Sequence, residues 1–410
     1  MSTLELLHSK QKVDRFIPLR DPCADRHFKD LFRPSINNSE NLVDLRRSIL
    51  SFKPPKSAIV SSLDENFLPI EEEPFKKSKD NSIVIQNGHT QLIRASGFRN
   101  DYYNHLLDCR DENTIISILD NTPYLLDRKS SEMTALPAGA SQGEELLTSV
   151  KFAKEGPTRL ALGSELGLIR FLDLHSGRGE IYDLHTSRIG CLDWNPHSPF
   201  IIASGSKDKY IKIKDLRSPA RYVSKFSGHS GEICGLAWNK SGSVLASGGN
   251  DNLVNVWDLR GPQIKKTEIS SHKAAIRGLC WAPFRDNLLA SGGGSGDMRI
   301  LVHNTDKAKI VKEIATDSQI CAISWDEETK ALITGHGFSR YQVCVWDFES
   351  ERFVYELLGH SNRVLSLVQA GSEGLVVSGS SDETVRVWDV RKILKGWNKK
   401  ASLLTPVKIR

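Results

Sequence analysis

The chain has 410 residues, enough for one large domain or two ordinary ones, and its shares of hydrophobic (39%) and charged (26%) residues are those of a globular protein. No apolar run approaches the roughly 18 residues that a membrane-spanning helix needs, and the start, MSTLELLHSK, lacks the pattern of a secretory signal. The net charge is +5, but residues 391–410 carry seven basic residues and no acidic one, which leaves the remainder slightly acidic. This distribution argues against a general nucleic-acid-binding protein, and we expect neither a nucleic-acid nor a membrane partner.

The seven cysteines indicate a reducing compartment. Their number is odd, no two have C-x-x-C spacing, and five lie in apolar runs where a free thiol behaves as a small hydrophobic group. We therefore expect no disulfide framework, no metal site and no cofactor, and we expect the protein in the nucleus and the cytoplasm.

The first informative element is a short peptide, DRFIPLR, at residues 14–20 of a polar leader. Two arginines flank an apolar Phe-Ile pair, and the proline disfavours helix at the residue before it. An extended segment with an apolar anchor and two guanidinium groups is suited to being gripped by another protein, although a solvated basic loop is an equally good interpretation of these residues alone. The predicted docking residues of this peptide are Asp14, Arg15, Phe16, Ile17, Pro18 and Arg20.

The leader as a whole, residues 1–88, is polar, charge-mixed and interrupted by proline. Such stretches cannot bury enough apolar surface to order themselves, so we predict that the leader is disordered until bound. Residues 397–410 form a second segment that we predict to be flexible and basic, ending in Ile409-Arg410.

Between these segments one pattern recurs seven times with a period of about 40 residues. In each copy, short β-branched strands alternate with turns of Gly, Ser, Asn and Asp. The copies end in PYLLD, LIRFLDL, IKIKD, VNVWD, MRILVH, VCVWD and VRVWD. A four-stranded sheet cannot bury both of its faces alone, so the units are expected to stack as blades around an axis.

The Gly-His dipeptide, the turn aspartate and the strand tryptophan recur at fixed offsets and resemble the WD-repeat family. That resemblance implies a buried hydrogen-bond network inside each blade, so a structural role is predicted for these residues in place of a catalytic one. The glycine-rich runs match no phosphate-binding loop and recur at blade turns. The predicted network residues are His229, Asp251, Trp257, His360, Asp382 and Trp388.

These observations predict an all-β fold, a seven-bladed WD40 β-propeller at residues 89–396. Propellers usually fasten the ring by lending a strand from one end of the chain to the blade at the other end. Residues 90–95 are the candidate closing strand, with a linker as the alternative.

The DRFIPLR peptide, the seven WD copies and the final Ile-Arg together resemble the Fizzy and Fizzy-related coactivators of the anaphase-promoting complex, a ubiquitin ligase. In that family the peptide is the C-box, and it docks with the Ile-Arg tail into grooves of tetratricopeptide subunits. The resemblance implies a non-enzymatic activator and substrate receptor that docks through the C-box and through Ile409 and Arg410. Two weak contacts on flexible tethers reinforce each other by avidity.

The resemblance also implies two sites for degradation signals, or degrons, on the propeller. A destruction box would bind between the first and last blades, where Cys109 stands in place of the family's tryptophan. A KEN-type motif would bind on the top face, where Ser295 stands in place of the usual threonine; for Asn250 a plain turn role is the alternative. The implied KEN-type residues are Asn250, Asn252, Ser295, Gln319 and Arg363, and the implied destruction-box residues are Leu107, Asp108 and Glu383.

The implied partners are the tetratricopeptide subunits, degron-bearing substrates such as cyclins and securin-like proteins, and checkpoint or pseudosubstrate inhibitors. Residues 1–100 contain no Ser-Pro or Thr-Pro, the sites through which cyclin kinases act on Fizzy-related leaders, which predicts a specialised, for example meiotic, member. One alternative is a WD scaffold unrelated to ubiquitin. Another is an enzyme that uses His105, His185 or His303 at blade edges.

Overall fold

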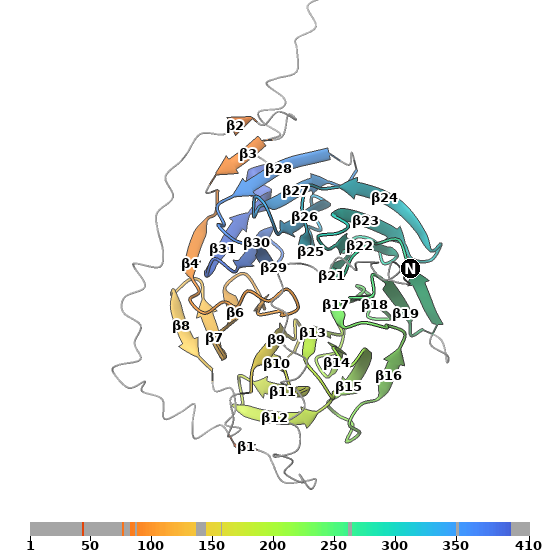
Figure 1. The fold of residues 1–410 in the computed structure, drawn as a ribbon. Coiled ribbons are helices and arrows are strands. Elements are labelled where there is room, and N and C mark those ends of the chain that lie inside the picture. Colours follow the sequence, from red (N-terminus) through yellow and green to blue (C-terminus); the bar gives the residue numbers. More distant parts are fainter. Residues whose placement is uncertain are drawn as a thin grey trace, which may run out of the picture. The chain divides into compact units, whose positions relative to one another are not determined.

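The computed structural model describes residues 83–86, 88–136, 145–156, 158–260, 265–349 and 352–394, together with the backbone of 43–44 and 76–77. The strands form seven sheets, and the first strand of each blade contacts the first strands of the blades beside it, including the last blade and the first (Figure 1). This closed ring confirms the predicted all-β, seven-bladed propeller.

Each blade has four principal strands, of which the first is innermost. Blades 1 to 3 consist of β5 (Leu107–Cys109), β6 (Thr114–Leu119), β7 (Thr122–Asp127) and β8 (Glu132–Ala135); β9 (Leu147–Phe152), β10 (Arg159–Ser164), β11 (Leu168–Asp173) and β12 (Arg178–Asp183); and β13 (Ile189–Trp194), β14 (Ile201–Ser206), β15 (Tyr210–Asp215) and β16 (Ser224–Ser227). Blades 4 to 6 consist of β17 (Ile233–Trp238), β18 (Val244–Gly249), β19 (Val254–Asp258) and β20 (Lys265–Ile269); β21 (Ile276–Trp281), β22 (Leu288–Gly293), β23 (Arg299–Asn304) and β24 (Lys309–Ala315); and β25 (Ile320–Trp325), β26 (Ala331–His336), β27 (Val343–Asp347) and β28 (Arg352–Leu358). Blade 7 consists of β29 (Val364–Ala370), β30 (Leu375–Ser380), β31 (Thr384–Asp389) and β4 (Gln91–Arg94).

Blade 7 is closed by a strand from the other end of the chain. β4 runs antiparallel to β31, with Ile93 opposite Val385, and the Thr90 N–H donates to the Val387 carbonyl at 2.7 Å (Figure 1). The side chain of Ile93 is buried in the core between blades 7 and 1. The prediction of a closing strand at residues 90–95 is therefore confirmed.

The propeller also takes in residues that we assigned to the leader. β3 (Ile83–Gln86) adds to the outer edge of blade 6 in parallel with β28, placing Ile85 opposite Leu357. β2 (Lys76–Lys77) pairs with β3, and β1 (Val43–Asp44) pairs with β12. β3 lies before the boundary predicted at residue 89, because isolated apolar residues in a polar segment can pair with an exposed strand edge without a periodic pattern of their own.

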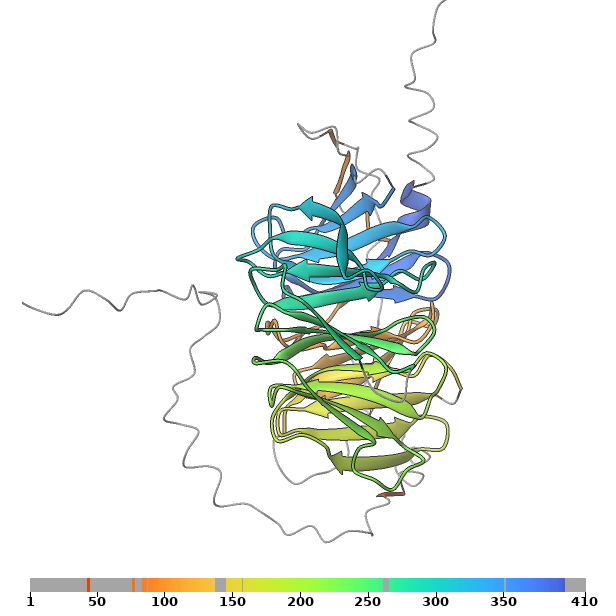
Figure 2. The ribbon, with the colours of Figure 1, turned by 90° about the vertical axis from the view of Figure 1, so that its right-hand side faces the viewer.

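A short helix at 390–394 follows β31 and lies against blade 6 (Figure 2). The Arg391 guanidinium pairs with Asp326 at 2.9 Å, and the Tyr355 hydroxyl donates to the Ile393 carbonyl at 3.1 Å. No helix in the described part of the chain has the length and apolarity to cross a membrane.

The second strands of blades 4 to 7 are buried along their whole length, because blades cover both of their faces. This explains the glycine-rich runs. A Cβ atom on Gly248 of β18 would lie 2.5 Å from the Ile276 carbonyl oxygen of blade 5, so only glycine permits this approach. These glycines serve close packing of blades.

The predicted His–Asp–Trp networks are confirmed, and a serine joins their parts. In blade 4, His229 Nδ1 lies 3.0 Å from Asp251, and both His229 Nε2 (2.8 Å) and Trp257 Nε1 (2.9 Å) bond Ser247 Oγ. Blade 7 repeats this with His360, Asp382 and Trp388 around Ser378. The serine lies in the second strand, where the sequence pattern alone did not distinguish it from a turn residue.

Blades 3, 5 and 6 keep parts of the network with substituted residues, and in blade 6 Thr334 replaces the serine and bonds Trp346. Blade 3 has His185, Asp208 and Ser204, but Lys214 stands at the tryptophan position and donates to backbone carbonyls. Blade 5 has His303 at that position, bonded to Ser291 at 2.8 Å. The alternative of an enzyme loses its support here, because His185 and His303 are buried structural groups.

The axis of the ring is crossed by two side chains. Six inner strands have a β-bulge after their first residue. Four of the bulged residues, Cys234, Arg277, Cys321 and Leu365, have backbone groups outside the ladders. The Arg277 guanidinium donates to the carbonyls of Cys321 and Leu365, and His105 Nε2 lies 2.8 Å from the Cys234 carbonyl oxygen. Residues far apart in the sequence thereby join opposite sides of the ring.

Candidate degron-binding face

The two kinds of predicted site differ in where they fall. The predicted ligase-docking residues lie outside the described residues, so the C-box at 14–20 and the Ile-Arg tail remain predictions. The eight predicted degron-contacting residues are all described.

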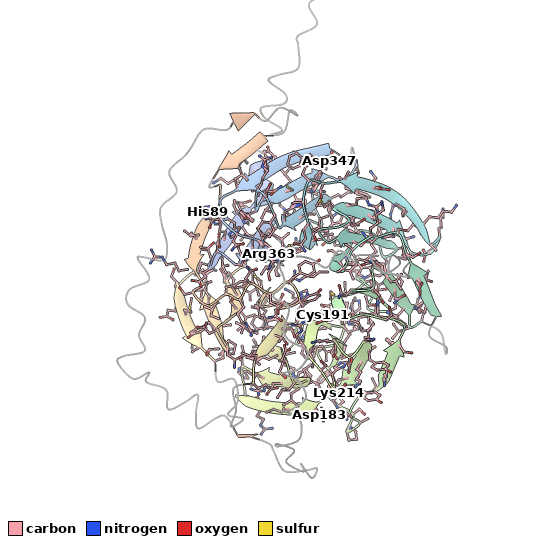
Figure 3. All side chains as sticks on the ribbon, viewed as in Figure 1. His89, Asp183, Cys191, Lys214, Asp347 and Arg363 are labelled. Atoms are coloured by element: carbon pink, nitrogen blue, oxygen red, sulfur yellow. The ribbon has the colours of Figure 1, made fainter. Side chains whose placement is uncertain are left out.

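The predicted KEN-type residues gather on one face of the propeller. Asn250 and Asn252 occupy the turn between β18 and β19, and Ser295 occupies the equivalent turn of blade 5. Gln319 and Arg363 immediately precede the inner strands β25 and β29. These five residues come from four successive blades at the end of the ring where the inner strands begin, and we call this end the upper face. Arg363 lies towards the middle of the ring (Figure 3).

Asn250 has a partner that the sequence did not reveal. The Tyr103 hydroxyl, from the segment before blade 1, donates to Asn250 Oδ1 at 3.3 Å. Asn250 is exposed, whereas Asn252 is half-buried and has a left-handed backbone, with φ of 65°. Tyr103 therefore holds the exposed Asn250 amide in place from another part of the chain. Asn252 occupies a turn position whose left-handed backbone favours asparagine.

Gln319 and Arg363 are both 4% exposed. The Gln319 Nε2 group is buried without a hydrogen-bond partner, and an unpaired buried donor of this kind is stabilised by an incoming acceptor. Arg363 Nε and Nη2 both donate to Asn100 Oδ1, at 3.0 and 2.5 Å. Asn100 therefore holds the guanidinium in place without neutralising its charge.

Next to these residues lies a charged cluster that the repeat pattern did not predict. Arg188 pairs with Glu232 at 2.8 Å and with Asp101 at 3.1 Å, lies 3.8 Å from Glu165, and stacks over the Tyr103 ring at 5.2 Å. Burial raises the pKa of Glu232 despite the neighbouring arginine. Three carboxylates surround this guanidinium, and Arg99 and Lys207 also interact with them, so the charges of the cluster are close to balanced.

The two predicted destruction-box acids, Glu383 and Asp108, differ in exposure, and they do not share an open surface. Glu383 is exposed in the turn between β30 and β31, on the upper face. Asp108 is 0% exposed within β5, where its carboxylate accepts the Phe152 N–H at 2.8 Å and pairs with Lys151 at 3.4 Å. A grip on a peptide arginine by both acids would require Asp108 to exchange these partners, so this site stays a prediction.

The surroundings of Asp108 show why it is buried. Leu107 packs into the seam of blades 1 and 7, where a Cβ on Gly379 would lie 3.1 Å from its Cδ2 atom. Cys109, at the position of the family's tryptophan, is fully buried, and burial raises the pKa of its thiol. Burial opposes the charged form of Lys151, but Asp108 and Asp193 raise the pKa of its amine.

The pattern of the family CDC20/Fizzy WD40 domain matches residues 93–388, which span all seven inner strands. The chain belongs to the CDC20/Fizzy family. Its relatives include the protein named anaphase-promoting complex subunit cdc20 of Dictyostelium discoideum, 35% identical over 88% of this chain and 74% of that protein. Cell division cycle 20.5, cofactor of APC complex, of Arabidopsis thaliana is 34% identical over 93% of this chain and 88% of its own length.

A crystal structure of a mitotic checkpoint complex contains a chain similar to this CDC20/Fizzy protein. The TM-score is 0.69 at 29% identity, over 78% of this chain and 96% of that chain. Family membership confirms the predicted resemblance and the prediction of a protein that is not itself an enzyme. Within the described ranges no group of three or more His, Cys, Asp or Glu side chains is placed to hold a metal ion.

Proposed function

We propose that this CDC20/Fizzy protein activates the anaphase-promoting complex and acts as its substrate-recognition subunit. The observation that carries the proposal is the convergence of the five KEN-type residues on the upper face of a propeller that belongs to this family. The repeat places these turns and loops of every blade at one end of the ring, but it does not fix their side chains, which here are the amides, hydroxyl and guanidinium that a peptide-binding site needs.

The chemistry of the upper face suits a Lys-Glu-Asn peptide. Arg363 has an uncompensated guanidinium for the glutamate, and the unpaired Gln319 amide can donate to the peptide asparagine or backbone. The Asp101 carboxylate beside Arg188 is 36% exposed and can pair with the lysine. We further propose that Glu383 receives the arginine of a destruction box at the seam of blades 7 and 1.

The C-box at 14–20 and the pair Ile409-Arg410 are proposed to dock into tetratricopeptide subunits of the ligase, with cyclins and securin-like proteins among the substrates. The relatives' names and the checkpoint-complex structure support ligase and inhibitor partners of this kind. A nuclear and cytoplasmic location and a role in meiosis are part of the same proposal.

A pull-down of the ligase from dividing cells tests the proposal. The full chain, the Arg15→Ala variant and a chain ending at Lys408 would be compared, with Arg94→Ala on the exposed edge of β4 as the matched control. We expect the full chain and the control to recover the ligase, and the other two to recover much less. Equal recovery by all four would favour the WD scaffold unrelated to ubiquitin.

The proposed meiotic role has a separate test. Purified protein would be treated with cyclin kinase and its ligase binding measured, because residues 1–100 contain no Ser-Pro or Thr-Pro. We expect binding to persist; its loss through phosphorylation of the leader would contradict the role.

A further inference from the structure

A cavity of about 440 Å³ lies on the axis of the ring, at the end opposite the upper face. Its rim includes Lys154, Lys240 and Pro283, which follow the ends of the inner strands β9, β17 and β21. The KEN-type residues lie where inner strands begin, so this cavity is separate from the proposed degron site. The volume is in the range of small-molecule sites.

The wall of the cavity is an aliphatic ring to which every blade contributes one side chain. These residues occupy equivalent positions in the seven inner strands, and in six of those strands the residue lies two positions after the bulge. Leu236 and Leu279 are only partly buried, so the ring has apolar surface open to a ligand. The ring consists of Leu107, Val150, Leu192, Leu236, Leu279, Ile323 and Leu367.

Arg277 borders the inner end of the cavity and has unmet bonding capacity. Its Nη atoms donate to the carbonyls of Asn104, Cys321 and Leu365, but its Nε is buried without a partner. Among the described residues no carboxylate pairs with this guanidinium, which is 3% exposed. A buried charge balanced only by backbone carbonyls is costly, so an anion that enters the cavity is attracted to it.

Two more features of the cavity favour an anion. The charged residues that line it are Lys151, Lys154, Lys240, Arg277 and Asp193. Lys151 pairs with Asp108 and Asp193, and Lys240 pairs with Glu327, so within the described ranges Lys154 and Arg277 are the lining cations with no carboxylate partner. Ser366 also lines the cavity. The residue is 5% exposed, and its buried hydroxyl has no hydrogen-bond partner. A donor next to a cationic group suits a carboxylate. Cys191, which also lines the cavity, lies near the middle of the ring (Figure 3).

We propose that the axial cavity binds an aliphatic carboxylate, with its head group at Arg277 and Ser366 and its apolar body against the aliphatic ring. Two sources offer this chemistry, a free medium-chain carboxylic acid and the C-terminal residue of a peptide that ends in an apolar side chain. The basic tail of this chain is a poor occupant, because its charge has the same sign as that of the cavity.

The test is calorimetric titration of the full chain with octanoate and, in a second arm, with a tetrapeptide ending in leucine. The uncharged analogues octanol and the amidated peptide accompany them. We expect octanoate to bind at least about ten-fold more tightly than octanol, because hydrogen bonds to a charged group are the stronger ones. Tighter binding by the free peptide than by its amide would identify a peptide terminus as the source.

Three variants locate the binding. Leu279→Trp fills the cavity and should abolish binding, while Leu166→Trp, at a 66% exposed surface position, should leave it unchanged. Arg277→Met should remove the preference for the carboxylate, and Arg277→Lys, which keeps the positive charge, should retain part of that preference. Thermal unfolding of each variant checks that it folds. Equal binding of octanoate and octanol, or undiminished binding by folded Leu279→Trp, would overturn the proposal.

Discussion

The Arg363 side chain is held by Asn100, a residue 263 positions earlier in the chain, through two hydrogen bonds to a single amide oxygen. Asn100 belongs to the segment that leads from the closing strand β4 into blade 1, and Arg363 begins blade 7. The junction that closes the ring therefore also positions the arginine that we propose to bind the glutamate of a KEN-type degron.

Replacing Asn100 with aspartate should weaken that binding. Asn100→Asp keeps the acceptor but neutralises Arg363, so we expect about ten-fold weaker affinity for a Lys-Glu-Asn peptide, the loss of one charge-assisted hydrogen bond. Fluorescence polarisation with a labelled peptide measures the change. A Lys-Gln-Asn peptide should be nearly insensitive, and so should the Asn304→Asp variant, which adds the same charge at the end of β23. Unchanged affinity in Asn100→Asp would show that Arg363 does not bind the glutamate.

The serine at the centre of a complete network should matter more than the serine of an incomplete one. Ser247 Oγ accepts the Trp257 indole N–H and bonds His229, whereas Ser204 bonds His185 and has no tryptophan partner. We expect Ser247→Ala to lower the free energy of unfolding by about 1–3 kcal/mol more than Ser204→Ala, since it leaves a buried indole N–H unpaired. Urea unfolding of the two variants checks this. Equal losses would mean that the indole bond contributes little.

Closure by β4 should depend on one buried side chain. Ile93 is 2% exposed and packs in the core of blades 7 and 1, so Ile93→Ala should lower the free energy of unfolding by about 2–5 kcal/mol. The neighbouring Arg94 is exposed, and Arg94→Ala should change it by no more than about 0.5 kcal/mol. Chemical unfolding measures both, and a small effect at Ile93 would contradict a stabilising role for the closing strand.

Buried histidines should make the propeller less stable in mild acid. Burial, and for His303 the nearby His272, lowers the pKa of His303 to about 3 and that of His336 to about 4, from 6.5. Between pH 6.5 and 4 the unfolded chain therefore binds more protons than the folded one. The contribution of these two histidines to stability is full above pH 6.5 and is lost below it, by up to about 1.4 kcal/mol per pH unit for each histidine.

The His303→Gln variant isolates one of these contributions. Glutamine can keep a hydrogen bond to Ser291 but does not titrate, so unfolding free energies at pH 7 and pH 5 should differ less than in the parent chain. The exposed His175→Gln variant is the control and should leave the slope as it is. A slope that is equally steep in His303→Gln would assign the acid sensitivity to other groups.

The sequence by itself determined the number of blades, the closing strand at 90–95 and the network residues His229, Asp251 and Trp257. Each depends on local rules: strand alternation, turn residues and fixed offsets within one repeat of about 40 residues. Such rules relate residues that are close together in the sequence, so they leave a pattern that can be recognised without the structure. The KEN-type residues were predicted from the family resemblance, and of these Asn250, Asn252 and Ser295 lie in turns between strands.

Only the tertiary structure decided the rest. The addition of β3 to blade 6, the burial of Asp108 beside Lys151 and the Asn100–Arg363 pair all join segments that share no local pattern. Arg277 shows the reason most clearly, because two of the carbonyls it binds, those of Cys321 and Leu365, are made available by bulges in other blades and meet only where the ring converges on its axis. Hydrogen-bond partners of this kind come together only when all seven blades close into a ring, so the sequence of a single repeat does not reveal them.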